Sequence, residues 1–363
     1  MDVNIDFLGN NGSSQGDVAG LIANGRMDSG SLRPFVCNTP GQNFGKSFCT
    51  VYIGGDKKKK TSYSTIQVNA GTLRPNEWRQ LDEAIMPISQ SRLVGVQDLI
   101  SRNLVYNLGN AMGTTVLEYH DISTAMEADV SMDGVTRGQG DRPVYGTKYL
   151  PIPIIHVDYE INTRTLNASR SLGNPLDTTS AEYAARAVAS KLENMLFTDT
   201  DYSFGGGSIK SYVNYGDRNQ VSLATSWTDS TITGEKIVDV VSEMKQASLD
   251  AKHYGPWVLY IPTNYETKMD EDYSSSKGSN TTRERILKLA GITDIKVVDT
   301  LADDNVLLVQ MTPDVVRLVN GMSITNVEWT SPDKFINKYK VLAIQVPQIR
   351  SDQDGNCGIV HLA

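Results

Sequence analysis

The spacing of apolar and polar residues separates the chain into a polar leader and a longer folded part. Residues 1–72 are rich in Gly, Asn, Ser and Thr, and their main apolar clusters are Leu21-Ile22 and the run from Phe48 to Ile53. Such a segment has too little apolar surface to form a core of its own. We therefore expect an extended N-terminal arm that becomes ordered by lying on a neighbouring molecule.

Helical periodicity begins after this leader. Pro75 suits the first turn of a helix, and Trp78, Leu81 and Ile85 follow at helical spacing. A second helix is predicted from about residue 94 to residue 108, ending at Gly109. Its apolar positions share one face: Val96, Leu99, Ile100 and Leu104.

Residues 111–150 change to a strand pattern. Thr114–Tyr119 and Ala128–Met132 are typical of strands, and this predicts a long two-stranded excursion. Because an isolated hairpin is only marginally stable in water, we expect the excursion to lean on another subunit. One alternating strand is then predicted over 150–161, with Ile152, Ile154, His156, Asp158 and Glu160 on one face and Pro153, Ile155, Val157, Tyr159 and Ile161 on the other.

The best defined helix is predicted over 180–198. Thr179 and Glu182 have the spacing of a capping box, and Glu182 and Arg186 form a favourable pair four residues apart. At the standard rise this helix is roughly 28 Å long. Gly205-Gly206-Gly207 follows, but it lacks the spacing of a phosphate-binding loop and does not lie between a strand and a helix, so we interpret it as a flexible junction.

From about residue 220 the pattern becomes α/β. A helix is predicted over Thr233–Lys252, and the apolar run Trp257–Ile261 indicates a buried central strand. Thr263 and Thr281 each stand three residues before a Glu and predict caps of two short helices. Further strands are predicted at 295–298, 306–311, 315–319, 338–349 and 357–362.

Composition and charge narrow the classes of function. The 363 residues carry a net charge of −8, which disfavours general nucleic-acid binding, although residues 1–70 hold seven basic against five acidic residues. Lys57–Lys60 is either a solvated hairpin tip or a contact to packaged DNA. The three cysteines are widely spaced, so we expect no disulfide framework. The N-terminal residues do not resemble a secretory signal, and the apolar runs are too short to cross a membrane.

Candidate chemical groups are scattered. The four histidines show no metal-binding spacing, and His156 is interpreted as structural. The adjacent acids Asp303 and Asp304 are interpreted as solvated, and the acidic stretch 270–280 departs from the spacing of a calcium loop. We therefore expect no catalytic, cofactor-binding or metal site.

The order of the elements resembles a known family. Leu-Arg-Pro-Asn-Glu-Trp at 73–78, Tyr-Leu-Pro-Ile-Pro-Ile-Ile at 149–155, the long helix from Leu176 to Phe197 and Gly-Ser-Ile-Lys-Ser-Tyr-Val-Asn at 207–214 follow one another. In the order and residue patterns of these elements, the chain resembles the major capsid proteins of tailed phages, which have the Hong Kong ninety-seven fold, and their relatives the encapsulins.

The resemblance implies an α+β capsid fold with an N-terminal arm, an E-loop, a P-domain with a long spine helix, and an A-domain. The implied divisions are an arm at 1–72, P-domain helices at 73–110, the E-loop at 111–150, a P-domain strand and the spine helix at 151–214, the A-domain at 215–330, and strands returning to the P-domain at 331–363. Plausible hinges are Gly146, Gly173 and Pro175.

The resemblance also implies a function. The chain is expected to self-assemble into pentamers and hexamers of an icosahedral phage head that encloses double-stranded DNA. Expected partners are further copies of the chain, the packaged DNA, a portal, scaffolding protein and decoration proteins, without a membrane. The expected place is the virion capsid, after assembly in the cytoplasm of a bacterial host.

Two alternatives remain open. The first is an encapsulin-type nanocompartment that encloses cargo protein, although about seventy residues precede the Trp78 segment here, more than is usual in encapsulins. The second is an α/β enzyme with a dispersed site. Such an enzyme predicts a small oligomer and a pocket with convergent polar groups.

The lysine content of the excursion generates a first prediction. Some relatives join a lysine of the E-loop to an asparagine of a neighbour, but within 111–150 the only lysine is Lys148, at the base. We expect no covalent cross-link between subunits. Intact-mass analysis and denaturing gels of mature particles should therefore show the monomer mass, whereas a covalent ladder would contradict the prediction.

Overall fold

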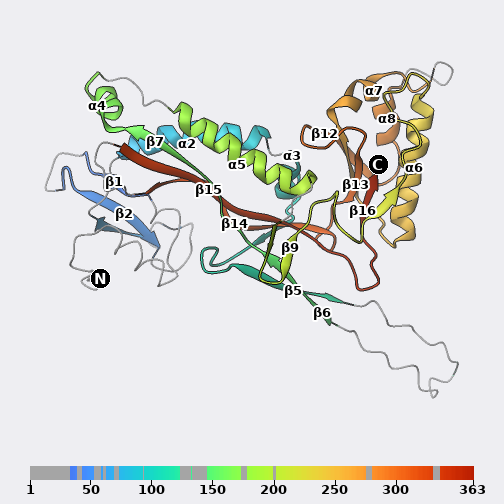
Figure 1. Cartoon of the computed structure of the whole chain (residues 1–363), viewed down its shortest axis with the longest axis horizontal. Coiled ribbons are helices and arrows are strands. Elements are labelled where there is room, and N and C mark those ends of the chain that lie inside the picture. The colour runs from blue at the N-terminus through green and yellow to red at the C-terminus, as the bar shows by residue number, and fades with distance from the viewer. Residues whose placement is uncertain are drawn as a thin grey trace.

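A computed structural model of the chain describes most of its residues. The described residues are 33–38, 43–52, 59, 63–68, 73–92, 94–122, 132, 145–172, 178–198, 202–274, 280–329 and 336–363. Figure 1 shows an elongated layer of helices on a sheet, with an α/β unit at one end and a hairpin leaving the body. No helix among the described residues is long and apolar enough to span a membrane.

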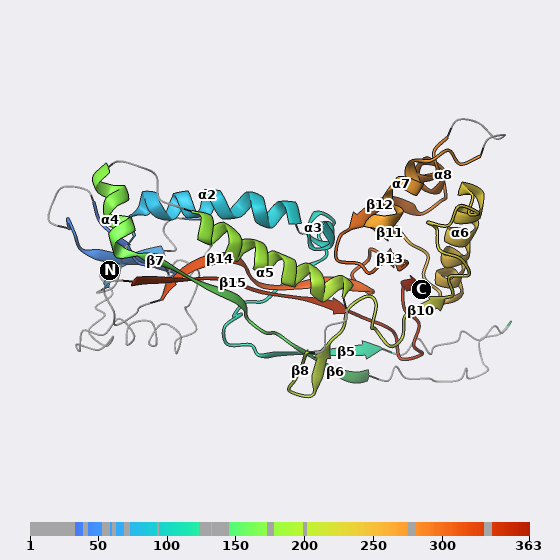
Figure 2. The ribbon, with the colours of Figure 1, turned by 45° about the horizontal axis from the view of Figure 1, so that its top comes forward.

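The elongated part is built on a four-stranded sheet. Its order is β4 (Val105–Asn107), β14 (Val316–Trp329), β15 (Ile336–Ile349) and β7 (Ile155–Asn162). The helices of this part are α2 (Pro75–Arg92), α3 (Val94–Ser101), α4 (Thr163–Leu172) and α5 (Thr179–Phe197). Figure 2 shows α2 and α5 lying on the same side of β14 and β15. The α+β class expected from the sequence is confirmed.

Helix α5 packs against the sheet through a face of small and aliphatic side chains. Ala181, Ala184, Ala185, Val188 and Leu192 are buried, as the helical spacing predicted. Alanine allows the close approach of α5 to α2, β7 and β15, and helix burial of this kind supplies most of the stability of an amphipathic helix.

The N-terminal cap of α5 differs from the prediction. The capping residue is Thr178, not Thr179, and its side chain makes no bond to the helix backbone. Its hydroxyl instead donates to Glu182 Oε1 at 2.8 Å. The Glu182 carboxylate therefore still holds the first turn, but through a neighbouring hydroxyl.

The second predicted helix is shorter than expected. Helix α3 ends at Ser101, where Asn103 takes a positive φ of 58°. The next residues form β4, which pairs in parallel with β14. Residues 105–107 therefore pair with β14 instead of continuing the helix. Ile100, which was expected on the apolar face, is exposed.

The α/β unit contains a five-stranded sheet. Its order is β10 (Asn219–Val221), β16 (Ile359–Leu362), β13 (Val306–Gln310), β11 (Trp257–Pro262) and β12 (Ile292–Val298). Its helices are α6 (Gly234–Asp250), α7 (Glu266–Asp270) and α8 (Thr282–Leu287), with a short 3-10 turn at Thr263–Tyr265. Trp257–Ile261 is the buried central strand that the sequence indicated.

This sheet has a core on each face. Along β11, Val258 and Tyr260 belong to the same hydrophobic cluster as α5, whereas Leu259 and Ile261 belong to the cluster beneath α6. Alternate side chains of a strand point to opposite faces, so β11 contributes to both cores. The fully apolar run that predicted this strand follows from that double burial.

Two strands belong to other sheets than the implied domain divisions predict. Residues 331–363 were expected to return together to the P-domain, but β16 lies in the α/β sheet between β10 and β13. Residues 215–330 were expected to form one A-domain, but β14 at their end lies in the elongated sheet. The predicted strand 315–319 is in fact 14 residues long. Its pairing with β15 along most of their length explains this extension.

Two hairpins lie on the opposite side of the elongated sheet from α5. The stem of the excursion is formed by β5 (Val116–Ile122) and β6 (Tyr145–Pro151), while β8 (Tyr202–Phe204) and β9 (Gly207–Ile209) form a second, short hairpin. The predicted single strand 150–161 is divided into β6 and β7, because residues 152–154, with Pro153 among them, break the ladder. The other predicted excursion strand, 128–132, lies almost wholly outside the described residues.

The described part of the leader is folded, contrary to expectation. Residues 35–68 contribute β1 (Phe35–Val36), β2 (Ser47–Tyr52) and β3 (Tyr63–Val68), which form an antiparallel sheet. Arg33 pairs with Asp82 at 2.5 Å, and Trp78 Nε1 donates to the Pro34 carbonyl at 3.0 Å. These contacts attach the sheet to α2, and they replace the expected extended arm over this part of the chain.

This attachment predicts the effect of truncating the leader. Deleting residues 1–45 would remove β1 and leave the buried Trp78 indole without its acceptor. An unpaired buried donor costs about 1–3 kcal/mol. We expect the 1–45 deletion to lower Tm by several degrees relative to a deletion of residues 1–32, measured by thermal unfolding. Equal Tm values for the two deletions would contradict the attachment.

Candidate functional site

The base of the β5–β6 hairpin is held by an ion pair whose carboxylate is buried and whose lysine is partly exposed. Asp121 of β5 and Lys148 of β6 lie 2.9 Å apart, and the Asp121 side chain is only 8% exposed. Gly146 is required beside this pair, because a Cβ at that position would lie 2.3 Å from Asp121 Oδ1. Gly146 was expected to act as a hinge, and its contact with Asp121 shows a packing reason for the glycine.

The same ion pair connects the hairpin to the body of the subunit. Lys148 Nζ donates to Ser351 Oγ at 3.4 Å, and the Ser351 hydroxyl donates to Asp217 at 2.6 Å. The Gln353 amide donates to the Asp121 carbonyl at 3.4 Å. Residues 217 and 351–353 belong to loops beside the α/β unit, so these bonds fix the direction in which the hairpin stem leaves the body.

The triple glycine forms a tight turn. Gly205 and Gly206 have φ values of +60° and +83° between the paired strands β8 and β9, which are the positive values that a two-residue hairpin turn needs. A Cβ on Gly207 would lie 2.1 Å from the Tyr149 carbonyl oxygen. The glycines therefore let this hairpin pack closely on β6, and the flexible junction predicted from sequence is wrong.

The C-terminal half of α5 carries a buried carboxylate. Glu193 is 3% exposed and accepts hydrogen bonds from Gly95 N at 2.7 Å and Val96 N at 3.5 Å, at the start of α3. The positive end of a helix favours a negative charge. A Cβ on Gly95 would lie 2.5 Å from the Phe197 ring, so only glycine permits this approach of α3 to α5.

A second buried carboxylate joins α3 to the α/β unit. Asp98 accepts a hydrogen bond from the Tyr260 hydroxyl of β11 at 2.9 Å and an ion pair from Lys296 of β12 at 2.7 Å. Glu193 thus links α5 to α3, and Asp98 links α3 to the α/β sheet. Around them pack the rings of Phe197, Tyr212 and Tyr260, with centroids 5.0–6.4 Å apart.

Burial raises the pKa of Glu193 to about 7. The backbone N–H groups of Gly95 and Val96 act in the opposite direction, but desolvation together with the nearby Asp98 and Asp299 outweighs them. A carboxyl whose pKa is higher in the folded than in the unfolded state stabilises the fold fully below the unfolded pKa, near 4.5. That contribution is lost as pH rises through 7.

The histidines do not form a site. His120 and His156 are exposed, and His156 lies 3.7 Å from Asp158. His361 is buried and lies between the Arg218 guanidinium and the Asn305 amide oxygen. Desolvation and the charge of Arg218 lower the pKa of His361 to about 4, so it is neutral and structural. Among the described residues, no group of three or more His, Cys, Asp or Glu side chains could hold a metal ion.

Of the acidic candidates, Asp303 is exposed, in agreement with the interpretation from sequence, whereas others make side-chain contacts. Asp304 was interpreted as solvated, but it accepts hydrogen bonds from Ser226 and Tyr265, each at 2.6 Å. In the acidic stretch, Asp270 pairs with Arg283 and Glu271 with Lys268. Of the tetralysine only Lys59 is described, and it is exposed; Lys57, Lys58 and Lys60 lie outside the described residues, as do Gly173 and Pro175.

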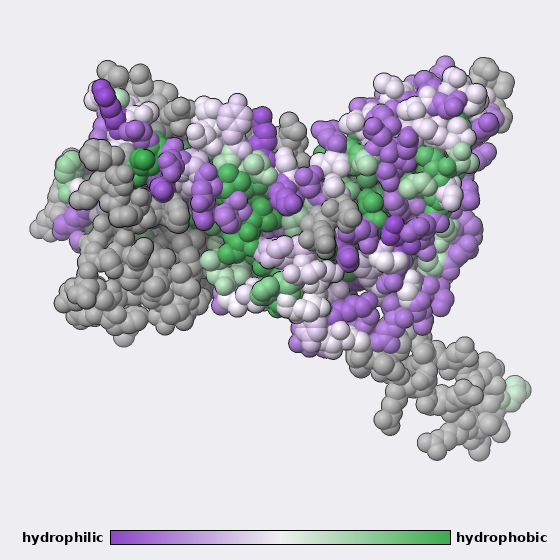
Figure 3. Space-filling view, in the orientation of Figure 1, coloured by the Kyte–Doolittle hydropathy of each residue, from purple (hydrophilic) through white to green (hydrophobic). Residues whose placement is uncertain are grey.

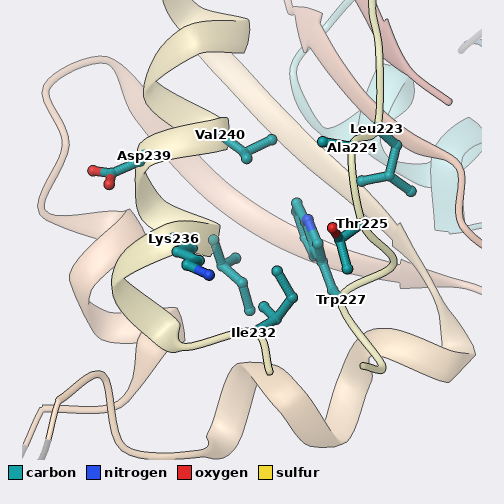
Figure 4. A pocket seen from close by; sticks show the side chains of 9 residues that line it. Leu223, Ala224, Thr225, Trp227, Ile232, Lys236, Asp239 and Val240 are labelled. Atoms are coloured by element: carbon teal, nitrogen blue, oxygen red, sulfur yellow. The ribbon is translucent and has the colours of Figure 1, made fainter. Parts of the chain in front are cut away.

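One cavity of about 310 Å³ lies between α6 and the segment 223–232. Its floor is Trp227, which stacks on Tyr265 at 4.9 Å. Figure 4 shows Val240, Ile232 and Leu223 around it, while Asp239 points away from Trp227. This lining is mostly apolar and lacks the convergent polar groups that the enzyme alternative requires.

Comparison with solved structures identifies the fold. The chain is similar to the virus-like particle from Pyrococcus furiosus, with a TM-score of 0.58 at 17% identity over 79% of this chain and 99% of that one. It is also similar to the capsid of Myoviridae phage XM1, with a TM-score of 0.56 at 11% identity over 74% of this chain and 91% of that one. These likenesses establish the Hong Kong ninety-seven capsid fold and confirm the resemblance stated from sequence.

Sequence comparison gives a relative and a family. The chain is 23% identical over 236 residues to the type 1 encapsulin shell protein EncA of Myxococcus xanthus (strain DK1622), covering 64% of this chain and 71% of that protein. A family model described as "Family of unknown function (DUF6260)" matches residues 69–362. The chain therefore belongs to this family.

The Glu193 contact generates a pH prediction. In the wild-type chain, Glu193 should make the free energy of unfolding fall by up to ~3 kcal/mol between pH 5 and pH 8. Glu193→Gln keeps an oxygen that can accept from Gly95 but cannot ionise, so this part of the pH dependence should disappear. Denaturant unfolding over this pH range measures it.

Glu182→Gln is the matched control, because Glu182 lies on the same helix but accepts its hydrogen bond from the Thr178 hydroxyl, away from α3. The control should keep the wild-type pH slope. If Glu193→Gln also keeps that slope, Glu193 does not titrate as described.

Proposed function

We propose that this chain is a major capsid protein of a tailed phage, which self-assembles into pentamers and hexamers of an icosahedral head around double-stranded DNA. The hairpin carries this proposal. Its stem β5–β6 forms a ladder only with itself among the described strands, and it is held on the body by side-chain contacts such as those of Leu117, Leu150 and Lys148. Such a hairpin is marginally stable by itself. A neighbouring copy would provide the surface that stabilises it.

The structural role of each segment belongs to the same proposal. Residues 1–72 are an arm, in which β1, β2 and β3 form a small attached sheet, and 111–150 form the E-loop. The P-domain comprises 73–110 and 151–214 with α5 as its spine, together with β14 and β15. The remainder of 215–330 and β16 form the A-domain. We propose no enzymatic activity and no cofactor, because Asp304 and His361 are engaged in structural contacts and no group of described His, Cys, Asp or Glu side chains could hold a metal ion.

The proposed partners are other copies of the chain, packaged DNA, a portal, scaffolding protein and decoration proteins. The proposed place is the virion, after assembly in the cytoplasm of a bacterial host. The ion pair of Lys148 with Asp121 also supports the proposal that mature subunits are not joined through this lysine.

The second candidate is the shell of a nanocompartment that encloses a cargo protein. The observation that favours it is the sequence relationship to EncA, whose name describes an encapsulin shell protein. The long leader before Trp78 favours the phage capsid instead. The two candidates share the shell architecture and differ in what the shell encloses.

Particle contents test the proposal. Particles from the producing cells should appear as closed shells in negative stain and elute far above the monomer in size-exclusion chromatography. They should also protect double-stranded DNA from nuclease. Shells that hold an enzyme and no DNA would contradict the phage capsid and favour the nanocompartment, and a small discrete oligomer from the same cells would contradict both.

A further inference from the structure

Two arginines lie on one face of the elongated sheet, near the base of the hairpin. Arg317 of β14 is paired in register with Gln348 of β15, and Arg350 follows Gln348 by two residues. Side chains two residues apart on a strand share a face, so Arg317, Gln348 and Arg350 lie together. The neighbouring pair Val319 and Val346 shows that this face is the one that packs against the hairpin.

Neither arginine has its charge neutralised within the described structure. Arg317 Nε donates to Gln348 Oε1, and its guanidinium lies 4.6 Å from the centre of the Tyr106 ring. Arg350 donates to the His120 carbonyl at 3.2 Å. All three partners are uncharged in these contacts, and in the described part of the chain no carboxylate forms an ion pair with either arginine. Lys148 of the same region contrasts with them, since it is paired with Asp121.

Gln348 adds a further unused donor. An arginine only donates hydrogen bonds, so the Gln348 oxygen must face Arg317 and the amide nitrogen must point elsewhere. Gln348 is fully buried, and its Nε2 has no acceptor among the described residues. The cluster therefore has donors in excess and lacks acceptors, which is unfavourable for buried polar groups.

The electrostatics agree with this geometry. Desolvation and the charge of Arg350 lower the pKa of Arg317, as expected for two like charges held in a partly buried place. Tyr119 of β5 faces the same charges. Its pKa is raised by desolvation and, to a smaller extent, by the Asp121 carboxylate, against the opposing effect of Lys148, Arg350 and Arg317.

We propose that Arg317 and Arg350 bind an oxyanion, either a carboxylate or a phosphate group, at the base of the β5–β6 hairpin. An oxyanion supplies the acceptor lone pairs and the negative charge that the cluster lacks, and arginine binds such groups with paired, charge-assisted hydrogen bonds. The site is formed within one subunit, so it does not depend on the proposed shell function. A bound oxyanion would hold the sheet and the hairpin base together.

Thermal unfolding and isothermal titration of the full chain test this site. Inorganic phosphate and glutarate are the two probes, each compared with chloride at the same ionic strength. At least one probe should bind saturably and raise Tm, and Arg350→Gln should weaken that binding by tenfold or more. Arg285→Gln is the matched control, because Arg285 also lies over a tyrosine ring, that of Tyr273, but in the α/β unit; it should bind as the wild type does.

The outcomes separate the sources of the oxyanion. Binding of phosphate alone indicates the phosphate of a nucleic acid or other phosphorylated ligand, and binding of glutarate alone indicates an acidic side chain of a partner. Either result supports the site. Equal responses of the wild type, Arg350→Gln and Arg285→Gln, or no response to either probe, overturn it. Arg317→Gln is a confirming variant. If it fails to fold, Arg350→Gln still decides the matter, because in the described structure the Arg350 side chain makes a single hydrogen bond, to the His120 carbonyl.

Discussion

The packing of α5 against the elongated sheet is the contact on which the rest of the subunit depends. Its alanine-rich face brings the helix close to α2, β7 and β15, and the same hydrophobic cluster continues into Val258 and Tyr260 of the α/β unit. The two parts of the molecule therefore share one core and do not meet only at a linker. Because α5 contacts both parts, its position fixes the α/β unit relative to the elongated sheet.

Polar contacts at the end of α5 make this junction specific. Glu193 holds the start of α3, and Asp98 of α3 holds Tyr260 and Lys296. Buried carboxylates are costly unless they are paired or hydrogen-bonded, so these contacts allow one relative arrangement of the parts more than others. On the opposite face, the Asp121–Lys148 pair fixes the hairpin stem in a similar way, while the arginines beside it keep unneutralised charge. A subunit with a stiff body and an overhanging hairpin is suited to assembly with copies of itself.

Elements could be predicted from the sequence where the local pattern of apolar residues matches the burial seen in the structure. The period of α5 and the apolar run of β11 predicted both elements, and the order of elements predicted the capsid fold. Prediction from the sequence failed where long-range pairing decided the outcome. Val105–Asn107 looked helical but pairs with β14, and β16 joins the α/β sheet although it follows β15 in the chain.

The candidate site was harder to predict. The register that places Arg317 beside Arg350 depends on the pairing of β14 with β15, and no motif in either strand indicates it. The burial of Glu193 could not be predicted from the sequence either, because an acid on a long helix is usually solvated. Its burial follows from Gly95, which lies 98 residues earlier in the chain and leaves room for the approach of α3. The glycines did not indicate this contact, and even Gly205-Gly206-Gly207, interpreted as a flexible junction, forms a tight turn.

We propose that the body of the subunit is stable alone, whereas the hairpin gains stability from a neighbouring copy. Hydrogen–deuterium exchange on the free subunit and on assembled particles would distinguish the two parts. We expect amides of α5 to be protected in both states, and those of β5 and β6 to exchange more slowly in the particle than in the free subunit. Equal protection of the hairpin stem in the two states would contradict the account.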